Sequence, residues 1–192
     1  MDDQSKRVSR VFEETIDLHR RVSAGDLGPV VDAARLVTAA IAGRGKLLVC
    51  GNGGSALDAQ HVAAELVGRF RAERPPLAAI ALTADTSILT SIANDFSYDD
   101  VFARQIHALA ACNDVLLAIS TSGRSKNVQC AVDAARSLGL KCIALTGFDG
   151  GSIGPAADIH INVPSRETAR TQEVHRTILH AICDLIEAGV ST

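Results

Sequence analysis

A run of hydroxyl-bearing residues around a glycine could hold an anion in this chain. The run is Ser120, Thr121, Ser122, Gly123 and Ser125, and it lies between a predicted strand and a helix predicted to begin near Ser125. Hydroxyls donate hydrogen bonds, glycine lets backbone N–H groups approach, and a helix amino terminus carries about half a positive charge. A phosphate group suits these donors. Alternatively, Ser125 only caps the helix and the other residues form turns.

A second loop, Gly51-Asn52-Gly53-Gly54-Ser55, also follows a predicted strand and opens a predicted helix. It lacks the lysine of a Walker loop and the G-x-G-x-x-G spacing of a dinucleotide fold, so nucleotide binding is disfavoured. Its backbone could instead approach a small polyol or a phosphate ester, with the Asn52 amide and the Ser55 hydroxyl as hydrogen-bond partners. A structural tight turn accounts for the same residues equally well.

Two pairs of side chains have helical spacing and could act together. His61 and Glu65 are four residues apart, so they can contact the same ion or substrate from one helix face. Gln172 and His180 are eight residues apart, about two turns, and lie on roughly the same side of the last predicted helix. Exposed His–Glu pairs are common without any site. His180 interrupts the apolar stretch TILHAICDLI, and that context favours a buried core histidine over a functional one.

Asn94 and Asp95 lie between the apolar segments SILTSIA and FSYDDVF. We interpret them as a polar loop that could contribute to a site. A simple Asx turn accounts for the same pair.

The elements that must position these groups alternate between strand and helix. Strands that are continuously apolar, rather than alternating with polar residues, need cover on both faces. We therefore predict a doubly wound α/β fold, in which helices flank a five-stranded parallel sheet. The five apolar runs are LLVC from 47, LAAIAL at 77–82, DVLLAIS at 114–120, KCIALTG at 141–147 and DIHINVP at 158–164.

Helices are predicted around these strands from apolar residues at helical spacing. Two lie within the first forty residues, one runs from Ala56 to about Arg69, and the last runs from about Glu167 to Glu187. In such sheets ligands bind where loops leave the carboxyl ends of the strands. The loops GNGGS, STSGRS and TGFDGG are therefore the ones to inspect.

Composition bounds the class of protein. The chain has 192 residues, 47% of them hydrophobic and 21% charged, which is typical of one globular domain. Its net charge of −3 and lack of a Lys/Arg block argue against nucleic-acid binding. No apolar run approaches the ~18 residues that span a membrane, and the polar start argues against a signal peptide, so we expect a cytoplasmic protein. The five cysteines have no CxxC spacing, which excludes a thiolate zinc knuckle.

Five motifs occur in an order that is far more specific than any one of them. They are CGNGGSALDAQHVAAELVGRF at 50–70, SIANDF at 91–96, AISTSGRSKNV at 118–128, ALTGFDGG at 144–151 and VPSRETARTQEVHRTILH at 163–180. This series resembles the sugar isomerase (SIS) domain family over nearly the whole chain, and within it the members that isomerise heptose phosphates. The resemblance implies a single SIS domain over residues 1–192, with assembly helices at 1–42, an α/β core at 45–188, and a homotetramer.

The resemblance also implies site residues. The substrate phosphate would be held by Ser120, Thr121, Ser122 and Ser125. The rest of the sugar phosphate would contact Asn52, Gly53, Gly54, Ser55, Glu65, Asn94, Asp95 and Gln172. One zinc ion per subunit would be bound by His61, Glu65, Gln172 and His180. An amide oxygen is an unusual zinc ligand, so the metal rests on the resemblance.

The implied reaction converts the ketose sedoheptulose 7-phosphate into the aldose D-glycero-D-manno-heptose 7-phosphate, the first step toward the heptose of bacterial surface glycans. An aldose–ketose shift through a cis-enediol needs a base to take a proton from carbon and an acid to protonate oxygen. The resemblance gives these roles to Glu65 and His180, with zinc opposite the developing enediolate charge. A zinc-bound carboxylate is a poorer base, so Glu65 would have to loosen from the metal during turnover. No redox cofactor is needed.

Two other functions fit the same family. SIS proteins that bind the replication initiator DnaA contain segments similar to DAQH, RPPLAAIAL and SIAND of this chain. They lack the acid/base pair that Glu65 and His180 supply here. An isomerase of a different phosphosugar is the other alternative. One departure is local: some family members have an acidic residue just before Arg170, where this chain has Ala169.

Overall fold

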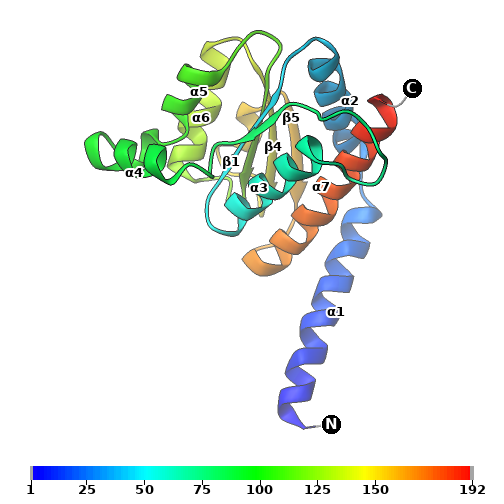
Figure 1. The fold of residues 1–192 in the computed structure, drawn as a ribbon. Coiled ribbons are helices and arrows are strands. Elements are labelled where there is room, and N and C mark those ends of the chain that lie inside the picture. Colours follow the sequence, from blue (N-terminus) through cyan, green and yellow to red (C-terminus); the bar gives the residue numbers. More distant parts are fainter. Residues whose placement is uncertain (1, 191–192) are drawn as a thin grey trace.

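A five-stranded parallel sheet runs through the middle of the computed structural model, which describes residues 2–190 (Figure 1). Its strands are β1 (Leu47–Gly51), β2 (Ala79–Ala81), β3 (Val115–Ser120), β4 (Lys141–Gly147) and β5 (Ile159–Val163). Their order across the sheet is β2-β1-β3-β4-β5, and every neighbouring pair is parallel. The predicted five-stranded parallel sheet is confirmed.

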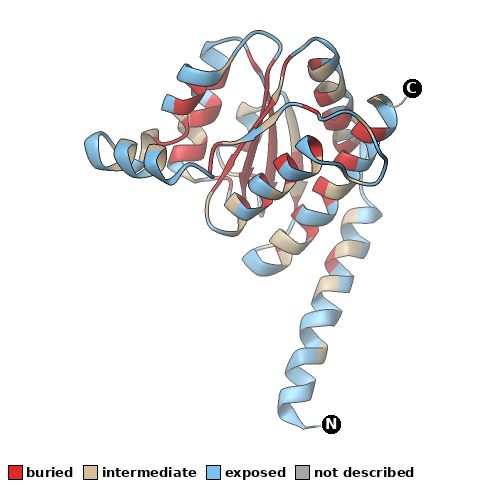
Figure 2. Cartoon of the chain, viewed as in Figure 1, coloured by how far each residue is buried: buried red, intermediate tan, exposed pale blue. Residues whose placement is uncertain are grey.

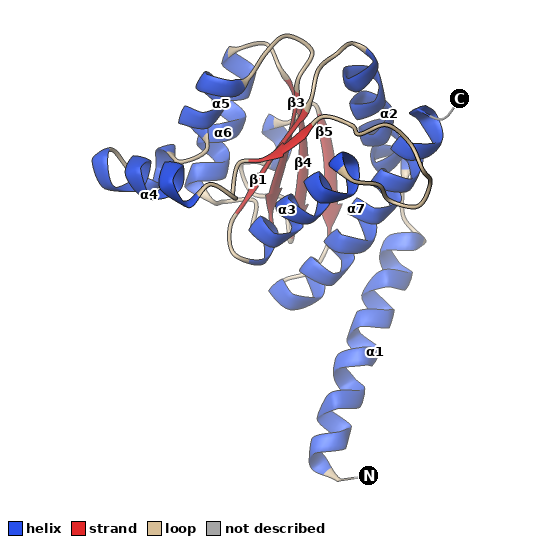
Figure 3. Cartoon of the chain, viewed as in Figure 1, coloured by secondary structure: helices blue, strands red, loops and turns tan. Residues whose placement is uncertain are grey.

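Helices cover both faces of the sheet (Figure 3). One face carries α2 (Gly28–Ala42), α3 (Gly54–Val67) and α7 (Thr168–Val190), with the end of α1 (Asp3–Ser23). The other carries α4 (Thr86–Asp95), α5 (Ala103–Leu109) and α6 (Lys126–Ser137). Two short 3₁₀ helices, η1 (Tyr98–Asp100) and η2 (Gly154–Ala156), complete the elements of the described chain.

Alternation along each strand divides the core into two layers. Leu47 and Val49 point into the layer under α2, α3 and α7, whereas Leu48 and Cys50 point into the layer under α5 and α6. All four side chains are 0–1% exposed, as expected for a strand whose side chains alternate between two covered faces. Figure 2 shows the central strands buried between exposed outer helix faces. The runs in the sequence are continuously apolar because the side chains on both faces of these strands are buried.

Strand β2 is shorter than predicted. The run 77–82 forms a strand only over Ala79–Ala81, and these residues are partly or fully exposed. The strand lies at the edge of the sheet and pairs with β1 alone. An edge strand of small side chains buries little, so the sheet keeps only three of its residues.

The interpretation of Asn94 and Asp95 as a loop is wrong. Both residues belong to the last turn of α4. That helix starts because the Asp85 carboxylate accepts the backbone N–H of Ile88 at 2.9 Å. Its apolar face then packs on the core beneath α5 and α6 through Leu89, Ile92 and Ala93. Helical spacing of these apolar residues outweighs the turn preference of the Asn-Asp pair.

The first half of α1 extends away from the rest of the molecule (Figure 1). Its start is fixed by Asp2, whose carboxylate accepts the N–H of Ser5 at 2.7 Å. Leu18 is its one buried residue, while Phe12 remains 64% exposed. Among residues 2–190, no helix combines the length and apolar character needed to cross a membrane.

Candidate functional site

The sheet order changes direction between β1 and β3, and the two glycine-containing loops follow these two strands. The helix after β1, α3, lies on one face of the sheet, and the helix after β3, α6, lies on the other. The loops therefore diverge at the carboxyl edge, which is where open α/β sheets bind ligands. The predicted phosphate loop and the Gly51–Ser55 loop meet there.

The Ser120, Ser122 and Ser125 side chains bond within their own loop, called the hydroxyl loop below, and Ser125 does not cap α6. The Ser120 and Ser125 hydroxyls lie 3.0 Å apart, and Ser125, although it is the N-cap residue of α6, makes no side-chain cap hydrogen bond. The Ser122 hydroxyl accepts the N–H of Arg124 at 3.2 Å. Ser125 therefore leaves the N-cap position of α6 without a side-chain acceptor, although the Asn127 side chain accepts the N–H of Val128 at 2.9 Å; the remaining N–H groups of the first turn suit an anion.

A neighbouring loop holds the hydroxyl loop in place. Arg124 donates two hydrogen bonds to the carboxylate of Asp149, at 2.8 and 2.7 Å. These bonds lower the pKa of Asp149 to about 2. Gly123 has φ +63°, and a Cβ at this position would overlap the carbonyl oxygen of Gly150. The loops after β3 and β4 are therefore in direct backbone contact.

Two asparagines join the loops across the change in strand order. Asn52 donates to Asn127 at 2.8 Å, and Asn127 donates back to Asn52 at 2.9 Å. The hydroxyl of Tyr98 also donates to Asn52, at 3.0 Å. Sequence reasoning missed Asn127 and Tyr98, and the only available signals were the place of Asn127 inside the STSGRSKNV motif and the absence of any other tyrosine.

The remaining predicted sugar contacts are divided between exposed and buried positions. Asn94 and Asp95 are exposed and bond to one another at 2.7 Å. Ser55 is 3% exposed, so its hydroxyl lies beneath the loop. Gly54 is in close contact with Gln172, whose amide a Cβ at position 54 would overlap. Within residues 2–190 the Gln172 side chain makes no hydrogen bond of its own.

His61, Glu65 and His180 form a compact cluster between α3 and α7. One ring nitrogen of each histidine and one carboxylate oxygen all lie within 4.8 Å of one another. The two Nε2 atoms are 2.7 Å apart, and His61 Nε2 is 3.3 Å from Glu65 Oε1. All three residues are partly exposed. The core interpretation of His180 is therefore wrong, because the packing of α7 on α3 puts its ring at the surface beside His61.

The cluster has donors that suit zinc. Imidazole nitrogens and a carboxylate are ligand types that zinc accepts, and three protein ligands leave a position open for substrate or water. Gln172 is apart from these three atoms, against Gly54 at the other end of α3. The structure thus brings together three of the four residues expected to bind the metal.

The end of α3 that carries Glu65 is held by a buried ion pair. Arg74 donates to the backbone carbonyls of Glu65 and Leu66, each at 2.9 Å, and to the Glu187 carboxylate at 3.0 Å. Glu187 also accepts three backbone N–H groups from residues 70–72. The N–H of Ala72 makes the largest contribution to lowering the pKa of Glu187. No sequence pattern indicated this arrangement.

A second ion pair connects the start of α3 to α7. Arg176 donates to one carboxylate oxygen of Asp58 at 2.7 and 3.1 Å, and Asp58 is 2% exposed. His175, the residue before Arg176, is fully buried and bonds to the Thr146 carbonyl at 2.9 Å. Ion pairs at both ends of α3 therefore fix its position against α7, and with it the approach of His61 to His180.

Comparison with known proteins defines the class. Residues 11–147 match the model of the SIS domain, and the chain belongs to the SIS domain family. It is similar to proteins named phosphoheptose isomerase. One, from Aromatoleum aromaticum, is 53% identical over 184 residues, which cover 94% of this chain and 93% of that protein.

Solved structures agree with this similarity. The phosphoheptose isomerase of Neisseria gonorrhoeae superimposes with a TM-score of 0.92 at 46% identity, over 96% of this chain and 99% of that one. The phosphoheptose isomerase of Francisella tularensis gives a TM-score of 0.91 at 40% identity, over 98% and 100% of the two chains. The predicted family and fold are confirmed.

Proposed function

We propose that this chain is an aldose–ketose isomerase that converts sedoheptulose 7-phosphate into D-glycero-D-manno-heptose 7-phosphate. The observation that carries the proposal is the convergence of a carboxylate and an imidazole, Glu65 and His180, from two helices that ion pairs hold together. Similarity to phosphoheptose isomerases over 94% of the chain supplies the substrate. The hydroxyl loop after β3 is the proposed phosphate site.

The chemistry moves one proton between neighbouring carbons. The Glu65 carboxylate removes a proton from C1, beside the C2 carbonyl, while His180 donates a proton to the carbonyl oxygen, which gives a cis-enediol. Return of the proton to C2 and loss of the proton from the C1 oxygen complete the aldose. Both steps are proton transfers, so the chemistry needs no redox cofactor.

We propose that zinc would be held by His61, Glu65 and His180. A metal-bound carboxylate is a poorer base and a metal-bound ring nitrogen carries no proton, so Glu65 would have to loosen from the metal to act as the base, and His180 would have to donate from a nitrogen that is not bound to it. When bound, it would stabilise negative charge on the enediolate oxygen. Gln172 joins as the fourth ligand and as a substrate contact only if its amide leaves Gly54. The clustering supports this assignment, because one donor atom from each of the three residues lies within 4.8 Å of the others.

Turnover of sedoheptulose 7-phosphate, followed by NMR of the aldose product, tests the proposal. Glu65→Gln should lower kcat by about 10²- to 10⁴-fold, the usual effect of removing a general base. Glu73→Gln is the matched control, because that carboxylate is exposed and lies outside the cluster. Chelation should reduce activity and added zinc should restore it. A folded, zinc-loaded protein without turnover contradicts the proposal and redirects attention to initiator binding or another phosphosugar.

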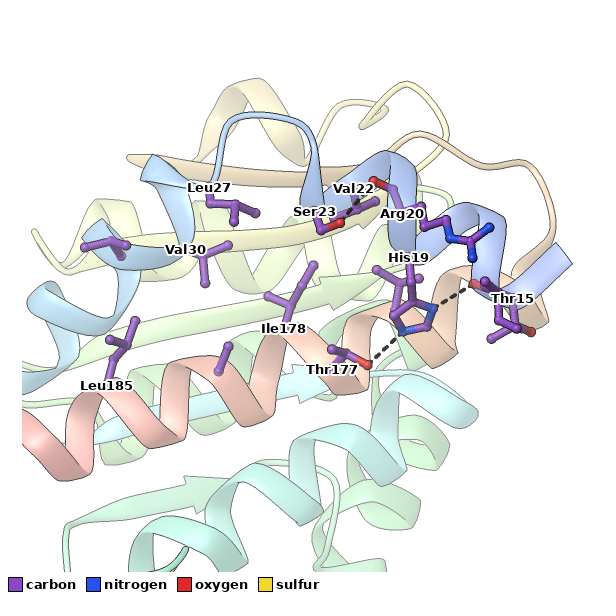
Figure 4. Close-up of a pocket in the computed structure, with 14 residues that line it drawn as sticks. Thr15, His19, Arg20, Val22, Ser23, Leu27, Val30, Thr177, Ile178 and Leu185 are labelled. Atoms are coloured by element: carbon purple, nitrogen blue, oxygen red, sulfur yellow. Dashed lines mark hydrogen bonds between the residues drawn. The ribbon is translucent and has the colours of Figure 1, made fainter. Parts of the chain in front are cut away.

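We propose further that the protein is a homotetramer, in which a second copy covers α1. A groove of about 580 Å³ lies between α1, α2 and α7, and its walls include Val22, Leu27, Val30 and Ile178 (Figure 4). Beyond the groove α1 exposes further large apolar side chains, Phe12 among them. A helix whose apolar side chains face water gains stability only when another surface covers them. An identical helix offers that complementary apolar face.

We also propose a cytoplasmic location. All five cysteines are free thiols, and Cys50, Cys142 and Cys183 are buried. Unpaired cysteines are typical of proteins from reducing compartments. The pKa of Cys142 is raised to about 12, mainly by burial, so this thiol resists oxidation.

A further inference from the structure

A cavity of about 230 Å³ adjoins the proposed phosphate loop. It lies where the loops after β3, β4 and β5 meet. Its lining includes Thr121 and Ser122 after β3, Phe148 after β4, and Ser165 and Arg166 after β5. Two of the four residues expected to bind phosphate, Thr121 and Ser122, therefore line a cavity that Arg166 also lines.

Phe148 is held in an unusual backbone conformation. Its φ is +55°, a region that bulky L residues rarely occupy. Both of its backbone groups are fixed: the N–H donates to the Ser165 carbonyl at 3.0 Å, and the carbonyl accepts from Asn162 at 3.0 Å. Backbone strain of this kind persists where the surroundings enforce it, and it concentrates at ligand sites.

The Arg166 guanidinium lies over the Phe148 ring. The central carbon of Arg166 lies 4.2 Å from the ring centroid, within the range of a cation–π contact. Arg124 is also near this ring, at 5.8 Å, but Asp149 binds its guanidinium with two hydrogen bonds. Arg166 makes no hydrogen bond or ion pair within residues 2–190. Its five N–H donors thus lack a protein acceptor.

The charges near the hydroxyl loop indicate a function for the Arg166 guanidinium. Arg124 is the only charged side chain in Ser120–Ser125, and Asp149 neutralises it. A sugar phosphate brings close to two negative charges at neutral pH. The hydroxyls and the start of α6 offer hydrogen bonds and about half a positive charge, so the loop alone leaves the phosphate undercompensated.

We infer that Arg166 binds the substrate phosphate from across this cavity, and that Phe148 orients its guanidinium for that contact. The inference rests on the proposed isomerase function and adds a residue that determines specificity for phosphorylated sugars. A planar guanidinium can bind two phosphate oxygens at once, which a lysine cannot do. The contact is remote from C1 and C2, so it serves binding in the ground state and the transition state alike.

Steady-state kinetics with sedoheptulose 7-phosphate and inhibition by inorganic phosphate test the inference. Arg166→Met keeps the aliphatic length and should raise both KM and the inhibition constant of inorganic phosphate by roughly tenfold or more, the usual loss for a charge-assisted contact. The value of kcat should stay within about twofold, because uniform binding is lost. Arg166→Lys should fall between the two, and Phe148→Leu should weaken phosphate binding with Arg166 still present.

Two controls separate this role from a structural one. Arg136→Met removes an arginine from the last turn of α6, at the opposite edge of the sheet, and should leave KM unchanged. Inhibition by unphosphorylated sedoheptulose should be the same in wild type and Arg166→Met. A KM and a phosphate inhibition constant that both stay at the wild-type value in Arg166→Met overturn the inference.

Calorimetry with inorganic phosphate alone keeps the inference separate from the proposed function. If the wild type binds phosphate but does not turn over the sugar phosphate, the isomerase proposal fails, and weaker phosphate binding by Arg166→Met still supports the role of Arg166. If the wild type turns over the sugar phosphate and both proteins bind phosphate equally, the inference alone fails.

Discussion

Replacing Gly123 with alanine tests whether contact between two loops shapes the phosphate site. Gly123 has φ +63°, and its added Cβ would overlap the Gly150 carbonyl oxygen. Gly139 is the matched control: its φ is +76°, and nothing lies within 4 Å of an added Cβ. The two substitutions share the cost of a left-handed conformation and differ only in the overlap.

The magnitudes follow from these two terms. The left-handed conformation costs an L residue about 1–2 kcal/mol, and this is all that Gly139→Ala should lose. Forcing two packed loops apart adds about 1–3 kcal/mol, as in overpacked cores, so Gly123→Ala should lose about 2–5 kcal/mol. At about 2–4 °C per kcal/mol for a chain of this size, the thermal midpoint falls by about 4–20 °C for Gly123→Ala and about 2–8 °C for Gly139→Ala.

Thermal unfolding followed by circular dichroism gives the midpoints, and sedoheptulose 7-phosphate kinetics give KM. Gly123→Ala should raise KM because the displaced loop misplaces the Ser122 hydroxyl, whereas Gly139→Ala should leave KM unchanged. Equal midpoints and equal KM values for the two variants would refute the reasoning, since the overlap would then have no consequence.

Three other outcomes are expected. Burial lowers the pKa of His175 from its ordinary 6.5. As pH falls below about 6.5, this histidine is therefore protonated in the unfolded chain before it is protonated in the folded one, and the free energy of unfolding declines. Urea titrations at several pH values should show a shallower decline for His175→Phe, and an equal decline in the two proteins contradicts this. The pKa of Asp149 is lowered to about 2, chiefly by the hydrogen bond from Arg124, so that pair contributes fully above the ordinary carboxyl value and is lost only as pH falls toward 2. Asp149→Asn should therefore lower the thermal midpoint at pH 7, because Arg124 loses the carboxylate that joins its loop to the loop after β4, whereas in the wild type this pair should cause no change in the midpoint between pH 8 and 5. Phe12→Asp should convert tetramers to smaller species in light scattering, and a tetramer that survives this change would exclude α1 from the interface.

The sequence predicted elements best where one local pattern had a single physical explanation. The run KCIALTG coincides with β4 because both faces of that strand are buried. The run 77–82 is longer than β2, which covers only Ala79–Ala81. The place of this strand at the edge of the sheet depends on strand pairing, which no local sequence pattern encodes. Asn94 and Asp95 were predicted to lie in a loop because Asn and Asp favour turns, but the helical spacing of the apolar residues before them extends α4 through both.

Site residues on one loop were easier to group than residues on different elements. The Ser120–Ser125 loop could be recognised as a unit, since its members are neighbours in the chain. The contact of His61 with His180 joins residues 119 positions apart and depends on how α3 packs on α7. The ion pairs of Asp58 and Glu187 that fix this packing left no pattern in the sequence.

The mutual hydrogen bonds of Asn52 and Asn127 bear on how the enzyme takes up its substrate. They join the loops that lead into α3 and α6, which lie on opposite faces of the sheet. Side chains that are already immobile lose little conformational entropy when a ligand binds, a saving of about 0.5–1.5 kcal/mol for each one. These two bonds therefore order the floor of the site between α3 and α6, and less ordering is left to be done when a sugar phosphate binds.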